Sequence, residues 1–331
     1  MSAGKEKSGV PKELIKFIKT GSKFIIAGHK EPDGDCVGCQ LTLRSVLVRL
    51  GKKAVVCSEG PFKRAELKNY AAFFSASPTE EEKDGAKVIV VDCSGIERTG
   101  SLKELLEELP FAVIDHHAAG THLQSTEQAP VYVEPDSPSC TLLIYKLIKE
   151  LDMTLTEEEA SLLLFGLCTD SGYFRHLTEK NADVFEAAAG MVKSGASPKN
   201  IFNIMNGGKT LSSRILLGHL LSRTESHFDG KLLLSYETLE EFNTFGFEGR
   251  DSENLNRLLL SVDEAEAVVI IRQERVDYCT VSLRSVEKID VAKIAASHGG
   301  GGHKNASGLA MEGIISDVKQ IMLKSFSAVF Q

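Results

Sequence analysis

Acidic and imidazole side chains occur in short clusters in the first half of the chain. In the loop 29–35, His29, Asp33 and Asp35 lie around Pro32 and Gly34. Proline and glycine favour a tight turn, so the three side chains can converge on one point. An imidazole combined with several carboxylates suits a hard-to-borderline divalent ion such as Mn²⁺, with Mg²⁺ or Co²⁺ as alternatives. The loop is therefore a candidate metal site.

More ligands of the same types follow along the chain. They are Asp92, Asp115, His116 and Asp170, and together with the first loop they exceed the needs of one ion. Surplus ligands with a carboxylate that can be shared indicate two ions, about 3.5–4 Å apart. Such a pair would bridge a hydroxide nucleophile and neutralise a phosphoryl group during in-line attack. Any one of these residues alone could equally be a surface residue or a helix cap, but the full set favours a metal centre.

Apolar segments precede these residues and are expected to be the strands that position them. The segments are 23–28, 87–91 and 111–114, and each leads directly into an acid or a histidine. Burying such groups costs several kcal/mol unless a partner, often a metal, satisfies them. Ligands delivered at the carboxyl ends of several strands are typical of an active site on a parallel sheet. Helical spacing between the segments predicts a doubly wound, mainly parallel α/β domain.

Helix-breaking residues then suggest a boundary between two domains. Gly, Ser, Pro and Asn cluster twice between 196 and 213, which predicts a linker there. The residues before it, 1–195, would form the catalytic domain. The residues after it, 214–331, would form a smaller α/β domain, in which 268–272 and 278–284 are predicted to be paired strands.

Four consecutive glycines near the end of the chain form another candidate site. They occupy 299–302 and are followed at once by His303 and Lys304. A flexible loop would explain the glycines alone. With the two cations beside them, backbone N–H groups and side chains arranged around a phosphate are the better interpretation.

Bulk properties limit the classes of partner. The 331 residues are 42% apolar and 25% charged, with a formal net charge of −8. That charge argues against tight binding of long duplex nucleic acid but leaves small phosphorylated substrates open. Apolar runs fall short of the roughly 20 residues that cross a bilayer, and the polar start of the chain has no signal core, so we expect a cytoplasmic protein without membrane contact. The seven cysteines, Cys36 and Cys39 included, are expected to be reduced packing residues.

Several of these stretches also resemble a known family. They are His29-Lys-Glu-Pro-Asp33-Gly-Asp35, the single Asp92, Asp115-His116-His117, Thr169-Asp170-Ser-Gly-Tyr-Phe-Arg175 and Gly299-Gly-Gly-Gly-His303-Lys-Asn-Ala-Ser-Gly308. The first four resemble the motifs of the DHH phosphoesterase family, and the last resembles the signature of its DHH-associated C-terminal domain. The length and the two-domain plan are most similar to the branch of oligoribonucleases (nanoRNases) that also dephosphorylate 3′-phosphoadenosine 5′-phosphate.

The resemblance implies a role for each matching residue. It places one Mn²⁺ on His29, Asp33 and Asp92. It places the other Mn²⁺ on Asp35, Asp92, His116 and Asp170, so that Asp92 bridges the two. The catalytic set would be Asp92, Asp115, His116 and His117, with Asp115 orienting a histidine and His117 facing the substrate phosphate. The substrate's other phosphate or terminal nucleotide would be bound by Arg284, Gly300, Gly301, Gly302 and His303.

The implied activity is a metal-dependent phosphohydrolase. It would degrade very short single-stranded oligoribonucleotides to mononucleotides and dephosphorylate 3′-phosphoadenosine 5′-phosphate, and a homodimer is a weaker expectation. One alternative is a phosphodiesterase specialised for cyclic di-AMP or its linear dinucleotide. Another is a non-catalytic nucleotide sensor, which the complete set of His and Asp ligands argues against, because a sensor does not need two metal sites.

Overall fold

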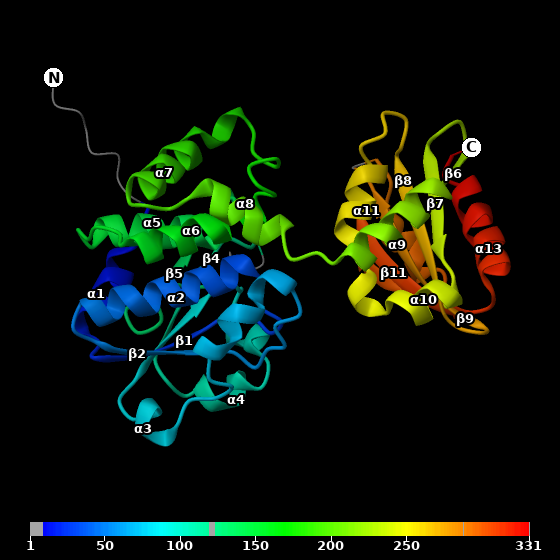
Figure 1. Cartoon of the computed structure of the whole chain (residues 1–331). Helices are drawn as coiled ribbons and strands as arrows, with labels where there is room; N and C mark the ends of the chain where they lie inside the picture. The colour runs from blue at the N-terminus through cyan, green and yellow to red at the C-terminus, as the bar shows by residue number, and fades with distance from the viewer. Residues whose placement is uncertain (1–8, 119–122, 287, 331) are drawn as a thin grey trace. The chain divides into compact units, whose positions relative to one another are not determined.

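The computed structural model describes residues 9–118, 123–286 and 288–330, and contacts divide the chain into two compact units (Figure 1). Unit 1 is Met1–Gly208 and unit 2 is Lys209–Gln331. The division falls inside the range 196–213 that the sequence suggests for a linker. That range is not simply extended chain, because helix α8 (Pro198–Asn206) lies in it and contacts another helix of unit 1. Pro198 at the start of α8 and the side chain of Ser197, which accepts from the Asn200 N–H, stabilise its first turn.

Unit 1 is built on a five-stranded sheet in which every neighbouring pair is parallel. Its strands are β1 (Lys23–Ala27), β2 (Lys53–Cys57), β3 (Lys87–Val91), β4 (Phe111–Asp115) and β5 (Val131–Val133), in the order β2-β1-β3-β4-β5. The central strands are apolar on both faces, as expected for a parallel sheet with two covered faces.

Helices cover both faces of this sheet, which confirms the doubly wound α/β prediction. The helices of the unit are α1 (Lys12–Thr20), α2 (Gly34–Arg49), α3 (Glu80–Lys83), α4 (Leu102–Leu106), α5 (Cys140–Glu150), α6 (Glu157–Asp170), α7 (Ala182–Lys193) and α8, with 3₁₀ turns η1 (Ala65–Phe73), η2 (Ile96–Thr99) and η4 (Glu179–Asn181). One hydrophobic core lies between α1, α2, α5 and α6 and the strand side chains on one face of the sheet. The other core lies between η2 and α4 and the strand side chains on the opposite face. The helix α8 packs on α6.

The strand order places a topological switch point between β1 and β3. The chain leaves β1 for β2 on one side and then crosses to β3 on the other side of β1. In open parallel sheets, ligands bind in the crevice beyond the carboxyl ends of strands at such a point. The loop that follows β1 and the residue that follows β3 both lie there.

Unit 2 is a second α/β layer structure with a mixed sheet. Its strands are β6 (Glu225–His227), β7 (Leu232–Glu237), β8 (Ala267–Arg275), β9 (Tyr278–Ser285), β10 (Gly301–His303) and β11 (Ala306–Glu312), in the order β10-β11-β9-β8-β7-β6. Only the β7–β8 pair is parallel among these described strands. The predicted pairing of 268–272 with 278–284 is confirmed as the β8–β9 hairpin.

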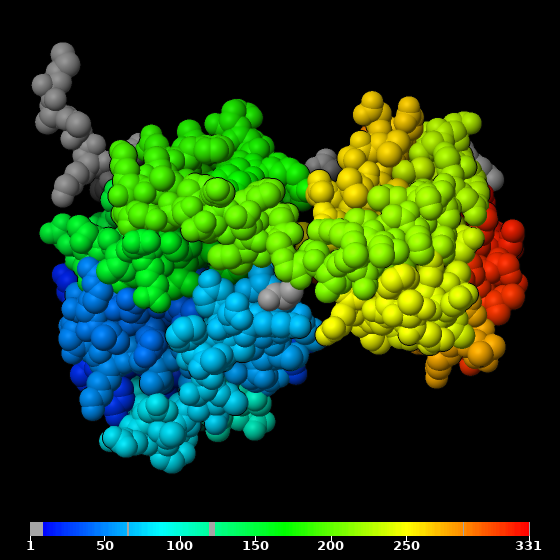
Figure 2. Space-filling model, viewed as in Figure 1, coloured from blue at the N-terminus to red at the C-terminus, as the bar shows by residue number. Residues whose placement is uncertain are grey.

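Helices also lie on both faces of the second sheet. On one face lie α9 (Leu211–Ser222), α10 (Leu239–Phe245), the 3₁₀ turn η5 (Phe247–Gly249) and α11 (Ser252–Leu259), which form the yellow-green and yellow surface of this unit in Figure 2. On the other face lie α12 (Val291–Ala296) and α13 (Ile315–Ser327). In the part of the chain that the structure describes, no helix combines the length and the apolar character needed to cross a membrane.

Candidate metal centre

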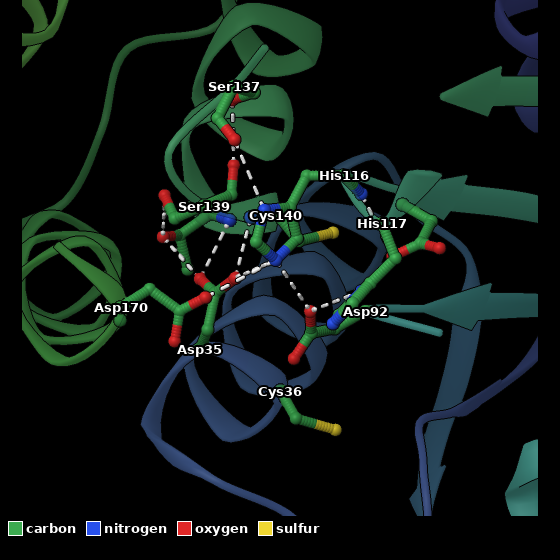
Figure 3. Close-up of polar contacts among 12 residues, drawn as sticks. Asp35, Cys36, Asp92, His116, His117, Ser137, Ser139, Cys140 and Asp170 are labelled. Carbon is green, nitrogen blue, oxygen red and sulfur yellow. Dashed lines mark hydrogen bonds and ion pairs between the residues drawn. The ribbon is translucent and has the colours of Figure 1, made fainter. Parts of the chain in front are cut away.

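The ends of two strands and two helices bring the sequence-predicted ligands of unit 1 together. Asp92 follows β3, His116 follows the last residue of β4, Asp35 lies in the first turn of α2, and Asp170 is the last residue of α6. Figure 3 shows these four side chains pointing toward one another. The cluster therefore consists of residues that are far apart in the sequence and meet beyond the carboxyl ends of the strands.

His116 stands at the centre of one ligand cluster. Its Nε2 lies 3.2 Å from Asp170 Oδ2, 3.4 Å from Asp92 Oδ1 and 3.9 Å from Asp35 Oδ2. The other ring nitrogen, Nδ1, lies 3.1 Å from the Ser137 carbonyl oxygen. A hydrogen bond from Nδ1–H to that carbonyl leaves the lone pair on Nε2, which is the tautomer that binds a metal.

Asp35 is fixed by the first turn of α5. Its carboxylate accepts hydrogen bonds from the Cys140 N–H (2.5 Å), the Thr141 N–H (2.9 Å) and the Thr141 hydroxyl (2.6 Å). The side chain is fully buried. Burial raises the pKa of the Asp35 carboxyl well above its ordinary value, and the neighbouring Asp92 and Asp170 carboxylates raise it further. Clustered acids of this kind repel one another unless a cation lies between them.

A second cluster forms around His29. Its Nε2 lies 3.6 Å from Asp92 Oδ2 and 3.8 Å from Asp33 Oδ1, while its Nδ1 is 2.8 Å from the Lys30 carbonyl oxygen. Asp33 also caps α2, because its Oδ1 accepts from the Asp35 and Cys36 N–H groups. The two clusters share Asp92, whose Oδ2 faces His29 and whose Oδ1 faces His116.

Unpartnered atoms indicate that the two clusters suit cations. Asp92 is only 2% exposed, yet its Oδ1 has no hydrogen-bond partner among the described residues, and the same holds for His116 Nε2. Ligand atoms of Asp35, His116 and Asp170 all lie within 4.8 Å of one another. Imidazole and carboxylate donors at this spacing fit a divalent ion, which would satisfy the orphaned atoms.

Cys36 is closer to this chemistry than the sequence indicates. As expected it is a buried free thiol, and it lies 3.5 Å from Gln40 Oε1 as a donor. Its sulfur, however, also lies within 4.8 Å of ligand atoms of His29 and Asp92. Nothing in the sequence pattern separates this cysteine from Cys39, which has the same helical surroundings and belongs to no such group among the described residues.

His117 is held differently from His116. Its Nδ1 lies 2.7 Å from Asp115 Oδ1, and that same oxygen accepts from the His116 N–H. Burial alone would raise the pKa of the Asp115 carboxyl, but the hydrogen bond and positive charge of His117 hold it below its ordinary value. Asp115 is fully buried whereas the His117 side chain is 40% exposed. The ring is therefore anchored on one edge and open to a ligand on the other.

The remaining sequence-predicted residues lie in unit 2, and two of them line an open surface cavity of about 550 Å³. Arg284 and Gly301 line it, and His303 is exposed on β10, opposite Ala306, which is itself paired with Arg284. At Gly302 the backbone has a φ of 141°, and a Cβ there would lie 2.6 Å from the Ala306 carbonyl oxygen. This glycine is required for the close approach of β10 to β11.

Gly300 is required in the same way, because a Cβ at that position would lie within 2.4 Å of the Gly308 carbonyl oxygen. The glycine run is thus partly strand, since β10 begins at Gly301. Another residue lining the cavity, Arg272 on β8, was not recognised from the sequence as a site residue. Arg272 begins the polar run Arg-Gln-Glu-Arg that follows the apolar part of the strand, so the sequence gives no signal there beyond that of a strand end.

Comparison with known proteins agrees with this arrangement. Residues 23–167 match the model of the DHH family N-terminal domain, and residues 230–331 match that of the DHHA1 domain. The bifunctional oligoribonuclease and PAP phosphatase NrnA of Thermus thermophilus is 27% identical over 94% of this chain and 90% of its own length. The protein of the same name from Mycoplasma genitalium is 26% identical over 95% of each chain.

Among solved structures, an exopolyphosphatase-related protein from Bacteroides fragilis has the same fold. It superposes with a TM-score of 0.80 at 23% identity, covering 96% of this chain and 95% of its own. The two domain matches lie in the two units described above, and the ligand clusters lie in the first. The chain is therefore a member of the DHH family of phosphoesterases, with a DHH domain followed by a DHHA1 domain.

Proposed function

We propose that this phosphoesterase degrades very short oligoribonucleotides to mononucleotides and removes the 3′-phosphate of 3′-phosphoadenosine 5′-phosphate. The observation that carries the proposal is Asp92, which presents one carboxylate oxygen to each of two ligand clusters. The substrate class is supported by the two NrnA relatives, which match nearly the whole chain.

The ligand sets follow from the two clusters. One Mn²⁺ would be held by His29, Asp33 and Asp92. The other would be held by Asp35, Asp92, His116 and Asp170, with Mg²⁺ or Co²⁺ as substitutes in either site. When bound, such ions neutralise charge on a phosphoryl group and make a coordinated water more acidic. The protein itself holds the ligand side chains in position. The N–H groups of α5 donate hydrogen bonds to Asp35, and the Ser137 carbonyl orients His116.

His117 would bind and polarise the scissile phosphate. Its Nδ1 is hydrogen-bonded to Asp115, and the side chain is 40% exposed, so the other ring nitrogen is available to a ligand. With Nδ1 bonded to Asp115, Nε2 is the ring nitrogen that would contact a phosphate oxygen. This role differs from that of His116, whose Nε2 faces three carboxylates.

Unit 2 would supply further substrate-binding groups. Arg284, His303 and the glycines 300–302 supply a guanidinium, an imidazole and backbone N–H groups near one cavity. The net charge of −8 gives long strands little general attraction, which favours short substrates.

The test is hydrolysis by the full chain with Mn²⁺ of a panel containing di- to pentanucleotides, a 24-mer, 3′-phosphoadenosine 5′-phosphate and cyclic di-AMP. We expect kcat/KM to be highest for the shortest oligomers, with clear phosphate release from the bisphosphate. Preference for the 24-mer or for cyclic di-AMP would contradict the proposed substrate class. Binding of these nucleotides without turnover of any of them would identify a sensor instead.

A further inference from the structure

Cys36 places a sulfur beside one of the two ligand clusters, and the proposed function gives this sulfur no role. The Cys36 Sγ, a ring nitrogen of His29 and a carboxylate oxygen of Asp92 all lie within 4.8 Å of one another. Ligands bound to one tetrahedral ion at about 2.0–2.3 Å are roughly 3.3–3.8 Å apart. Small side-chain movements are therefore enough to bring these three atoms onto one ion.

The surroundings of Cys36 hold its sulfur near the end of β1. A Cβ at Gly28 would lie 2.1 Å from the Cys36 Sγ, so the glycine leaves the space that the sulfur occupies. On its other side the Sγ lies 3.5 Å from Gln40 Oε1. Gln40 is itself fixed, because its Nε2 donates to the carbonyl oxygens of Ile26 (3.1 Å) and Cys57 (3.0 Å). The fully buried thiol is thus packed where the first ligand loop begins.

The two other members of the group point to a cation independently of the cysteine. The Nδ1 of His29 lies 2.8 Å from the Lys30 carbonyl oxygen, which leaves the lone pair on Nε2 for a metal. That Nε2 lies 3.6 Å from Asp92 Oδ2. Asp92 is 2% exposed, and its other oxygen has no hydrogen-bond partner among the described residues. A buried carboxylate in this state costs free energy unless a cation is bound to it.

Cys36 changes the chemistry of the donors that this cluster offers. With His29, Asp33 and Asp92 the donors are nitrogen and oxygen, which suit Mn²⁺. With Cys36 they include a thiolate, a soft donor that favours Zn²⁺ and Co²⁺ over Mn²⁺ and Mg²⁺. Cysteine, histidine and aspartate are all common ligands of tetrahedral zinc. One cluster can therefore present two ligand sets, and the identity of the ion decides which of them is used.

We propose that Cys36 is a ligand for thiophilic divalent ions, Zn²⁺ or Co²⁺, at the cluster of His29 and Asp92, and that it raises the affinity of this site for them selectively over Mn²⁺. On binding, the metal–sulfur bond forms, the S–H bond breaks, and the proton passes to the buffer, with no change of oxidation state. The inference rests on the metal centre of the proposed function and deepens it, because it names the class of ion that one of the two sites prefers.

The test is an absorption titration of the metal-free full chain with Co²⁺. A sulfur-to-cobalt charge-transfer band should appear in the near ultraviolet, because imidazole and carboxylate ligands do not give that band. Cys36→Ser, which replaces sulfur by oxygen at nearly the same size, should abolish it. Cys39→Ser is the matched control and should keep the band. Cys39 lies on the same helix and is also fully buried, but it belongs to no ligand group among the described residues.

Affinities measured by competition with a chromophoric chelator give a second readout. Removing even an indirect partner of a metal ligand typically costs about 10–100-fold in affinity, so Cys36→Ser should weaken Zn²⁺ binding at least that much. Binding of Mn²⁺ should be nearly unchanged, since His29, Asp33 and Asp92 remain. If circular dichroism shows that Cys36→Ser is unfolded, Cys36→Ala replaces it, because alanine removes the sulfur without burying a hydroxyl.

The absence of the band in the wild-type protein, its persistence in the folded Cys36 variant, its loss in Cys39→Ser, or equal weakening of Zn²⁺ and Mn²⁺ binding would overturn the inference. Hydrolysis with Mn²⁺, measured separately, distinguishes this failure from failure of the proposed function. A protein that cleaves dinucleotides but shows no cobalt–sulfur band refutes only the role of Cys36. A protein that shows the band but hydrolyses none of the substrates refutes only the proposed activity.

Discussion

Replacing each of the two adjacent histidines by alanine should have a different effect on metal binding. His117→Ala removes a side chain that is 40% exposed and hydrogen-bonded to Asp115, and leaves the His116 N–H still bonded to that carboxylate. His116→Ala removes the nitrogen that lies 3.2–3.4 Å from Asp170 and Asp92. The first change should therefore spare the metal ligands, and the second should remove one.

The magnitudes follow from these contacts. Loss of one charge-assisted hydrogen bond to the scissile phosphate costs about 1.5–3 kcal/mol, so kcat/KM of His117→Ala should fall roughly 10- to 150-fold at saturating Mn²⁺. For His116→Ala, the acidic cluster would lack its imidazole, and the ion next to it should be lost. We therefore expect bound manganese to fall from two ions per chain to about one, a stoichiometry that follows from the two-ion proposal.

The assay is metal analysis after gel filtration, combined with phosphate release from a dinucleotide and from 3′-phosphoadenosine 5′-phosphate. Circular dichroism of both variants verifies that they are folded. Equal loss of manganese from the two variants would refute the division of roles between His116 and His117, as would unchanged turnover in His117→Ala.

Three further predictions concern the metals, the buried ion pair and the glycine run. Asp92→Asn, or excess EDTA, should abolish turnover and remove the stabilisation that Mn²⁺ gives in a thermal melt, and full activity in either case would exclude the two-metal arrangement. Glu159 is fully buried and accepts from Ser45 (2.7 Å) and Arg49 (2.6 Å), so Glu159→Ala should lower the free energy of unfolding by about 2–4 kcal/mol in urea titration. Burial alone would raise the pKa of Glu159, but its hydrogen bonds hold that pKa below the ordinary value. The loss of unfolding free energy in Glu159→Ala should therefore be complete near neutral pH and should become smaller as the pH falls below the ordinary pKa of glutamic acid. Gly302→Ala should lower the melting temperature and weaken nucleotide binding, because its Cβ would lie 2.6 Å from the Ala306 carbonyl oxygen, whereas Gly301→Ala has open space and should be tolerated thermally.

Much of unit 1 was predictable because its signals are local. Each apolar segment of a parallel strand is continuous in the sequence, and the ligand follows at once, as Asp92 follows β3. The order of the strands then dictates that these ends meet. What supports the ligands was not predictable, because the N–H groups that bind Asp35 come from residues 105 and 106 positions away.

Less of unit 2 could be predicted from the sequence, for the same reason. The strand β10 is Gly301-Gly-His303, a sequence with little intrinsic preference for a strand, and it forms through its pairing with β11. The surroundings of Arg272 likewise come from distant parts of the chain. Glu237, Ser252 and Arg284 come from separate elements of the chain and meet only in the folded domain.

The backbone of Asp92 narrows the choice of residues that can replace it. Its φ is 55°, a left-handed conformation that Asp and Asn tolerate better than other residues with a Cβ. Two independent requirements therefore favour a short carboxylate at this position, namely its proposed role as a shared metal ligand and the turn that presents it. Glutamate, which keeps the charge, should be a poorer substitute structurally than asparagine, which loses it. The Asp92→Asn variant would accordingly be the suitable inactive template for trapping an intact substrate, since it retains the loop geometry while lacking the shared charge.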